Sequence, residues 1–199
     1  MKKSAPRRRL TPAHRRDLLL DAAARIVSTE GASAATMDRI AVEADVSKAL
    51  AYAYFRNRTT LLAALLLREY PAFTWTETRP VDVTRAFEDI VRETTGSYIR
   101  HVVEKGVLLQ RLMAESAVAA SVVEHHSLGR DVTARFFGAQ MVRDHGVAPE
   151  TAVCAADILM GVTGAAGRIV DARGGNVEDM TALVTRIIMA AVRELSVTR

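Results

Sequence analysis

Cysteine, proline and aromatic residues are scarce in this sequence of 199 residues. It contains one cysteine, five prolines and 5% aromatic residues. The single cysteine, Cys154, excludes an intramolecular disulfide, and its alanine-rich surroundings predict a buried thiol, with a redox sensor as the alternative. Because prolines are few and alternating β-branched runs are missing, nearly the whole chain is predicted to be helical.

Long apolar segments are also missing. The N-terminus lacks the apolar stretch that a signal peptide needs, and no run reaches the roughly 18 apolar residues that a membrane span requires. The sequence therefore predicts a soluble, cytoplasmic protein.

The sequence has no motif of a catalytic or metal site. His101, His125 and His126 lack the helical spacing with a second ligand that zinc sites use. Neither a strand-flanked phosphate loop nor a nucleophile elbow is present. We therefore expect no enzyme, no cofactor and no metal.

Basic charge is concentrated in the first third of the chain. Residues 1–70 contain thirteen Lys/Arg and seven Asp/Glu, a net charge of +6, whereas residues 71–199 contain fourteen and sixteen, a net charge of −2. Residues 1–16 are predicted to form a flexible basic arm that is attracted to phosphates in a salt-dependent way. A solvated tail without a specific role is the alternative. Membrane adsorption is disfavoured because large apolar residues are missing.

Residues 36–58 read as two short helices joined by a tight turn. Thr36 and Ser47 can each cap a helix, because their hydroxyl groups can accept a hydrogen bond from a free backbone N–H. An apolar stripe at spacings of three and four follows the first cap, formed by Met37, Ile40, Ala41 and Ala44.

The second of these helices divides into an inner and an outer face. Ala51, Tyr54 and Phe55 are expected inside, with Leu50 near the boundary. The outer face is expected to hold Lys48, Ala49, Tyr52 and Ala53. One lysine, small residues and a tyrosine suit the major groove of DNA. A helical hairpin in an ordinary bundle would show the same caps and stripes, so periodicity alone leaves both interpretations open.

Six elements follow one another in order between residues 18 and 66. They are the apolar helix Leu18–Gly31, a Thr-x-x-x-Ile-Ala element at Thr36–Ala41, Val46-Ser47, a Tyr-x-Tyr-Phe run at Tyr52–Phe55, the basic Arg58, and the leucine-rich Leu61–Leu66. In order and spacing this stretch resembles the DNA-binding domain of the TetR family of transcriptional regulators. The resemblance implies an all-α fold, with an N-terminal helix-turn-helix DNA-binding domain and a C-terminal helical bundle for ligand binding and dimerisation.

Three positions depart from the family pattern. Asp45 stands at the turn where the family usually has glycine, and a left-handed backbone there costs an aspartate less than most residues. Ala53 replaces a larger residue that often reads DNA. Ala51 replaces a larger aliphatic residue in the core beneath the recognition helix.

The matched positions imply a set of DNA contacts. The expected set is Thr36, Arg39, Ser47, Lys48, Ala49, Leu50, Tyr52, Ala53, Tyr54 and Arg58. Lys48 is the candidate for a base-edge contact, with guanine as the usual partner of lysine. Thr36, Arg39, Tyr54 and Arg58 are expected at phosphates, which position the protein without reading sequence. The partner would be a double-stranded operator.

The rest of the chain is predicted to be a helical bundle. The expected domains are residues 17–70 for DNA binding, a linker at 71–81, and 82–199 for effector binding and dimerisation. Helices are expected near 82–104, 106–120, 121–145, 149–173 and 176–196, with breaks at Gly106, near residue 120, at Gly146–Pro149 and at Gly174-Gly175.

Gly161, Gly164 and Gly167 are spaced three residues apart within one predicted helix, which suggests close approach of another helix or of a ligand. In the TetR family the last two helices pair across a two-fold axis, which implies a homodimer. The interface expected here is Gly161, Gly164, Gly167, Leu183, Val184, Ile187, Ile188 and Ala191. The alternative is that both helices are monomer core.

The family resemblance also implies a small-molecule effector held in the central bundle. Candidate pocket residues are Thr94, Tyr98, Leu112, Met113, Phe136, Phe137, Met141, Met160 and Thr163, each of which could equally be core. We therefore expect a dimeric regulator, most commonly a repressor, that an apolar effector releases from a palindromic operator. A helical partner-binding protein that uses its basic arm on nucleic acid or acidic protein is the alternative.

Overall fold

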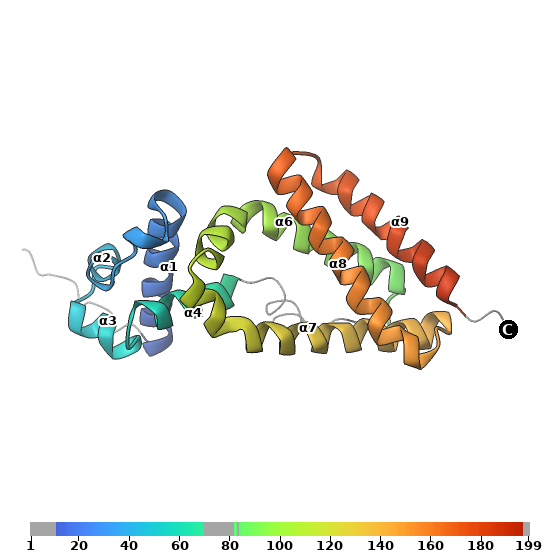
Figure 1. Ribbon diagram of the computed structural model, residues 1–199, viewed down its shortest axis with the longest axis horizontal. Coiled ribbons are helices and arrows are strands. Elements are labelled where there is room, and N and C mark those ends of the chain that lie inside the picture. The colour runs from blue at the N-terminus through green and yellow to red at the C-terminus, as the bar shows by residue number, and fades with distance from the viewer. Residues whose placement is uncertain (1–10, 70–81, 83, 197–199) are drawn as a thin grey trace, which may run out of the picture. The chain divides into compact units, whose positions relative to one another are not determined.

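The computed structural model describes residues 11–69, 82 and 84–196, without the side chains of residues 124–126 (Figure 1). Its helices are α1 (Pro12–Glu30), the 3-10 turn η1 (Ala32–Ala34), α2 (Met37–Glu43), α3 (Lys48–Tyr54), α4 (Arg58–Glu69), α6 (Phe87–Met113), α7 (Ser116–His145), α8 (Pro149–Arg173) and α9 (Val177–Leu195). Within the described residues there is no strand, only an isolated antiparallel bridge between Val147 and Ser196. The expected all-α fold is confirmed.

The chain divides into two compact units. The first contains the chain up to Leu66 together with Gln110–Ala120, and the second contains Leu67–Leu109 and the chain from Ser121 onward. Three helices, α4, α6 and α7, therefore each contribute to both units. The expected linker at 71–81 and arm residues 1–10 lie outside the described residues. Residues 12–16, assigned to the arm, instead begin α1.

Side-chain caps start the helices of the first unit. The Thr11 hydroxyl accepts a hydrogen bond from the backbone N–H of His14 at 3.3 Å, and Pro12 follows in the first turn. Thr36 Oγ1 accepts from the N–H of Arg39 at 3.3 Å, and Ser47 Oγ from that of Leu50 at 3.2 Å. The caps expected at Thr36 and Ser47 are confirmed.

Leucines of α1 and α4 dominate the core of the first unit. Its fully buried side chains include Leu19, Leu20 and Val27 of α1, Ile40 of α2, and Leu61, Leu62, Leu65 and Leu66 of α4. Arg111 from α6 completes the C-terminal end of α1, donating to the carbonyls of Val27 and Ser28 at 2.7 Å each. The unit thus combines local helix signals with contacts between residues distant in sequence.

The breaks expected at Gly106 and near residue 120 are wrong. α6 runs through Gly106 to Met113, and α7 starts at Ser116 and runs through residue 120. A Cβ atom at Gly106 would lie 2.7 Å from the carboxylate oxygens of Asp171 in α8. The Asp171 carboxylate thus lies in the space over Gly106, and this glycine sits inside α6 and does not end a helix.

The second unit is built on α8, which packs against its neighbours through small residues. Its core includes Phe87, Ile99, Met141, Ala152, Ala155, Ala156, Ala166, Val170, Val184, Ile188, Met189 and Val192. By length and composition alone α8 is also long and apolar enough to cross a membrane. Core helices of soluble proteins pass the same test, and here α8 buries part of its surface in the unit.

Candidate functional site

The turn between α2 and α3 is closed by backbone hydrogen bonds. The N–H of Val46 donates to the carbonyl of Ala41 at 3.0 Å, and the N–H of Asp45 to that of Val42 at 3.1 Å. These two bonds define a Schellman motif, whose left-handed position is usually glycine. Asp45 takes that position with φ of 52°. The turn therefore keeps its geometry with a residue that pays a conformational cost.

The outer face of α3 lies open to solvent. Ser47, Lys48, Ala49, Tyr52 and Ala53 are exposed, and Leu50 is half-buried. On the inner face Ala51 is 0% and Phe55 3% exposed, while Tyr54 is half-buried. The division predicted between the two faces is confirmed, and it leaves α3 able to enter a groove.

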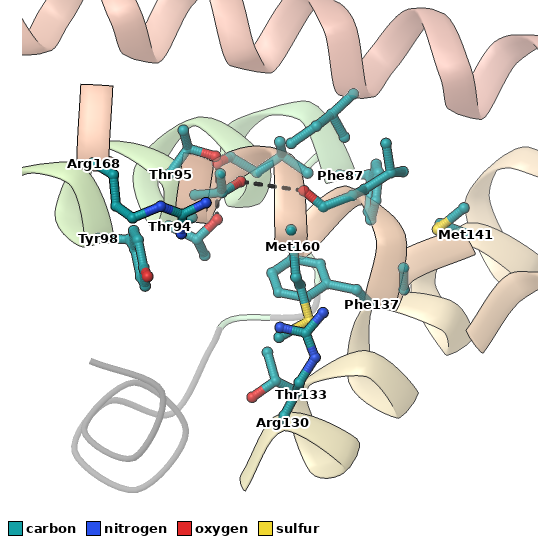
Figure 2. A pocket seen from close by; sticks show the side chains of 17 residues that line it. Phe87, Thr94, Thr95, Tyr98, Arg130, Thr133, Phe137, Met141, Met160 and Arg168 are labelled. Atoms are coloured by element: carbon teal, nitrogen blue, oxygen red, sulfur yellow. Dashed lines mark hydrogen bonds between the residues drawn. The ribbon is translucent and has the colours of Figure 1, made fainter. Parts of the chain in front are cut away.

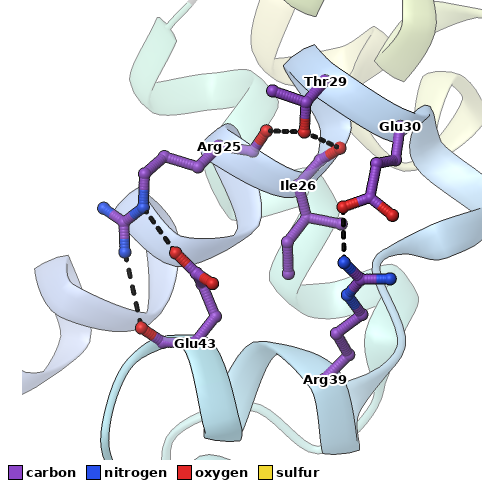
Figure 3. Close-up of polar contacts among 6 residues, drawn as sticks. All are labelled: Arg25, Ile26, Thr29, Glu30, Arg39 and Glu43. Carbon is purple, nitrogen blue, oxygen red and sulfur yellow. Dashed lines mark hydrogen bonds and ion pairs between the residues drawn. The ribbon is translucent and has the colours of Figure 1, made fainter.

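Two ion pairs fasten α2 to α1 on either side of Ile26 (Figure 3). Arg25 Nε lies 2.8 Å from Glu43 Oε1, and Arg39 Nη2 pairs with Glu30 Oε1. Both pairs are exposed, so each contributes little to stability. Arg39, expected at a phosphate, is thus already held by Glu30 and would have to exchange that partner for DNA.

Arg58 is not placed as expected. Its guanidinium points into the first unit, where Nε donates to the carbonyl of Ala35 at 3.1 Å and Nη2 to that of Ala32 at 2.6 Å. Nη1 pairs with Glu115 at 3.1 Å. The guanidinium binds three internal partners, so Arg58 joins α4 to η1 and to the residue before α7. It is therefore not free to bind a phosphate in this arrangement.

Arg56 is a cation that sequence reasoning missed. It lies between α3 and α4, is exposed, and has no ion pair with any described residue. Asn57 next to it caps α4, its side-chain oxygen accepting from the N–H of Thr60 at 2.8 Å. The Arg-x-Arg spacing at 56–58 was visible in the sequence, but which arginine faces inward was not.

Lys48 carries the charge of the outer face of α3. Its Nζ lies 2.8 Å from Asp38 Oδ1 and 6.0 Å from the ring centre of Tyr52. The hydrogen bond that Lys48 donates to Asp38, together with the negative charge of that carboxylate, raises the pKa of Lys48. Its partner on α2 is also exposed, and water or a base edge can therefore replace it.

The second unit contains a pocket of about 290 Å³ (Figure 2). Six of the nine effector candidates line it, namely Thr94, Tyr98, Phe137, Met141, Met160 and Thr163. Three do not: Leu112 is buried in the first unit, Met113 is 45% exposed, and Phe136 packs edge-on against Phe137 at 5.3 Å. Thr95, a neighbour of Thr94 that the sequence also offers as a hydrogen-bonding side chain, lines it too. Phe87, Val91, Arg130 and Arg168 also line it, although no sequence motif singled them out.

A family model described as bacterial regulatory proteins of the tetR family matches residues 19–65, the stretch from α1 into α4. A solved structure of MexZ, a key repressor responsible for antibiotic resistance in Pseudomonas aeruginosa, covers 93% of this chain and 96% of its own, with a TM-score of 0.64 at 20% identity. Residues 19–65 therefore match the TetR-family DNA-binding domain, and the whole described chain has the fold of TetR-family regulators.

Two further solved structures have the same architecture over nearly the whole chain. A putative TetR-family regulator from Rhodococcus sp. covers 92% of this chain and 100% of its own, with a TM-score of 0.65 at 18% identity. The flavonoid-responsive regulator FrrA covers 90% and 97%, with a TM-score of 0.63 at 21% identity. At these identities the likeness shows a common fold. A comparison with curated protein sequences finds no match.

The glycines expected at the TetR-type dimer surface do not lie together on the outside. Gly164 is buried near Tyr98, and a Cβ at Gly167 would lie 3.2 Å from the Val102 side chain of α6. Only Gly161 is exposed. Steps of three residues turn by about 300° on a helix, so the three glycines spread over different directions.

The apolar residues of α9 divide in the same way. Val184 is 2% and Ile188 7% exposed, which places both in the chain's own core and not at a surface. Leu183 and Ile187 are each 43% exposed, and Ala191 is half-buried. A stripe of exposed or partly exposed small and apolar side chains remains on α8 and α9: Cys154, Ile158, Gly161, Ala165, Ile169, Leu183, Ile187 and Ala190. We call it the outer stripe.

Cys154 belongs to this outer stripe and is exposed, so the expected buried thiol is wrong. The alanines around it in sequence face the other side of α8, where Ala152, Ala155 and Ala156 are buried. Composition alone could not distinguish the two sides. No group of three or more His, Cys, Asp or Glu residues in the described part of the chain is arranged to hold a metal ion.

Proposed function

We propose that this TetR-family protein is a dimeric repressor, released from a palindromic operator when a small effector binds the pocket of the second unit. The observation that carries the proposal is the open outer face of α3, which offers Lys48 and Tyr52 between small alanines above a buried inner face. A helix of this kind fits the major groove bodily. A cytoplasmic location belongs to the same proposal.

The proposed DNA contacts differ from the set expected from the sequence in one basic residue. Lys48, Ala49, Leu50, Tyr52 and Ala53 remain candidates for base edges. Thr36, Ser47 and Tyr54 remain candidates for contacts to the phosphate backbone of DNA. Arg39 could join them after release from Glu30. Arg56 takes the place of Arg58, whose guanidinium is bonded inside the unit. Because few side chains can reach bases, DNA shape should share in specificity.

The outer stripe supports the dimer. Ile158 is 63% exposed on α8, and Leu183 and Ile187 continue the apolar surface on α9. Contiguous apolar surface of this kind commonly marks an interaction site. Two copies would present two α3 helices to successive half-sites and would bind jointly through a raised effective concentration.

Release requires that the effector distinguish two arrangements of the dimer. α4 and α6 are suited to transmit such a difference, since each contributes residues to both units. At the end of α4, the carbonyl of Glu69 accepts from His101 of α6 at 2.6 Å in the tautomer protonated at Nε2, and its carboxylate lies 3.2 Å from Lys105. By thermodynamic linkage, effector and operator should weaken each other's binding by the same factor.

Footprinting on the DNA flanking the coding region tests the proposal. We expect protection of a palindrome of short half-sites, with Lys48→Ala relaxing its sequence preference and Arg56→Ala weakening all sequences alike. Uniform, salt-sensitive binding without a protected site would refute operator recognition and favour the partner-binding alternative.

A further inference from the structure

The pocket of the second unit has a gradient of polarity along its length. On α6 the lining residues begin at Phe87 and end at Tyr98, about 16 Å apart at roughly 1.5 Å per residue. Phe87 packs edge-on against Phe137 at 6.3 Å, and both adjoin Met141 and Ala156 in the apolar core. One end of the pocket is therefore apolar.

The other end holds an arginine beside a tyrosine. A Cβ atom at Gly164 would lie 3.6 Å from both Arg168 Nη1 and Tyr98 Oη, so both polar groups converge on the space that this glycine leaves empty. Figure 2 shows Arg168 on the same side of the pocket as Tyr98, with Met141 on the opposite side.

The charges lining the pocket are unequal. Its described lining contains two arginines and no acidic residue. Arg130 is neutralised by Asp157, since its Nε pairs with that carboxylate and its Nη2 donates to the Asp157 carbonyl at 2.9 Å. Arg168 has no ion pair with any residue in the described ranges.

The other polar side chains of the pocket do not neutralise the charge of Arg168. The hydroxyls of Thr94 and Thr133 donate to carbonyls of their own helices, those of Val91 at 2.8 Å and Gly129 at 3.0 Å. Hydroxyls used in this way add weak polarity but no charge. An arginine without a partner beside an apolar pocket is the group that attracts a carboxylate most effectively, because its N–H groups match the two oxygens.

We propose that the effector of this pocket is an apolar organic monoanion, whose carboxylate binds Arg168 beside Tyr98 and whose apolar body extends toward Phe87 and Met141. This inference rests on the proposed function of the pocket and specifies the effector's chemistry. It also predicts rejection of amines, because the positive end of the pocket would repel an ammonium group.

Calorimetric titration of the full chain with octanoate, 1-octanol and n-octylamine tests the proposal. These probes share an apolar body and differ in the charge of the head group. The variants are Arg168→Gln, which removes the charge, and Arg168→Lys, which keeps the charge but loses the planar fork. Arg173→Gln is the matched control, since Arg173 is exposed on the same helix and does not line the pocket.

The wild type should bind octanoate about ten-fold more tightly than 1-octanol, as expected for about 1.4 kcal/mol from a charged hydrogen bond. Arg168→Gln should abolish that preference by weakening octanoate alone, with Arg168→Lys intermediate and Arg173→Gln unchanged. Equal binding of octanoate and 1-octanol, a preference for n-octylamine, equal weakening of both probes by Arg168→Gln, or no binding of any probe would overturn the inference.

Operator binding by the same preparations separates this inference from the proposed function. A chain that protects its operator but shows no carboxylate preference overturns the inference alone. A chain that binds octanoate through Arg168 but protects no operator overturns the proposed function and leaves the ligand chemistry established.

Discussion

Among the described residues, the first unit exposes three large hydrophobic side chains, Val42, Tyr52 and Met113, whereas the second exposes eleven. The first unit instead covers its surface with ion pairs such as Arg25–Glu43 and Lys48–Asp38. The surface of the first unit is thus suited to a charged, hydrated partner and that of the second to apolar ones. The difference indicates that the two units bind different kinds of partner. Four sets of variants test this difference.

The largest effect is expected at the outer stripe. Ile187→Glu should weaken the proposed dimer by about 100-fold or more, because it buries an unpaired charge at the interface. Light scattering at micromolar concentration would then give the mass of a monomer. Val107→Glu is the control, since Val107 is 53% exposed on α6, outside the stripe. A monomeric wild type, or equal loss with Val107→Glu, would remove the stripe as the interface.

Arg58 and Arg56 provide the next contrast, within the first unit. Arg58→Ala should lower the free energy of unfolding by about 2–3 kcal/mol, because the carbonyls of Ala32 and Ala35 lose a charged donor. Arg56→Ala should change it by less than about 0.5 kcal/mol while weakening operator binding. Urea denaturation and operator titration measure the two properties. If both variants have the same free energy of unfolding, Arg58 has no structural role and is again a candidate for a phosphate contact.

Gly138 and Gly161 are two helical glycines of the second unit with different surroundings. A Cβ at Gly138 would lie 3.1 Å from the backbone of Val153, whereas at Gly161 no described neighbour lies within 4 Å. Gly138→Ala should therefore cost about 1–3 kcal/mol. Gly161→Ala should gain up to about 1 kcal/mol from helix propensity when it is measured in the Ile187→Glu chain, where the proposed interface is open. Thermal unfolding would show a lower Tm for the first and a higher one for the second. A reversed order would contradict the packing of α7 on α8.

The smallest effect is expected at the turn between α2 and α3. Replacing Asp45 by glycine and by alanine removes the same carboxylate, but only glycine adopts φ of 52° without strain. Asp45→Gly should therefore be more stable than Asp45→Ala by about 1 kcal/mol in urea denaturation. If the two variants have equal stability, the left-handed turn carries no measurable cost.

Much of the first unit could be predicted because its signals are local. Thr11, Thr36 and Ser47 cap helices within three residues of themselves, and the apolar spacing of α3 identifies which face is buried. Such short-range features depend on backbone geometry that neighbouring residues set. Arg58 was assigned wrongly for the opposite reason, since its partner Glu115 lies 57 residues away.

In the second unit, local signals predict the helices but not the faces they bury. The sequence predicts the helical content, the bounds of α8 and α9 to within a residue, and the apolar periodicity of α9. Packing decided that Gly106 sits inside a helix, that Gly164 and Gly167 face inward, and that Arg168 lines a pocket with no ion pair to any described residue. Long helices present several faces with similar composition, and packing between residues distant in sequence selects which face is buried.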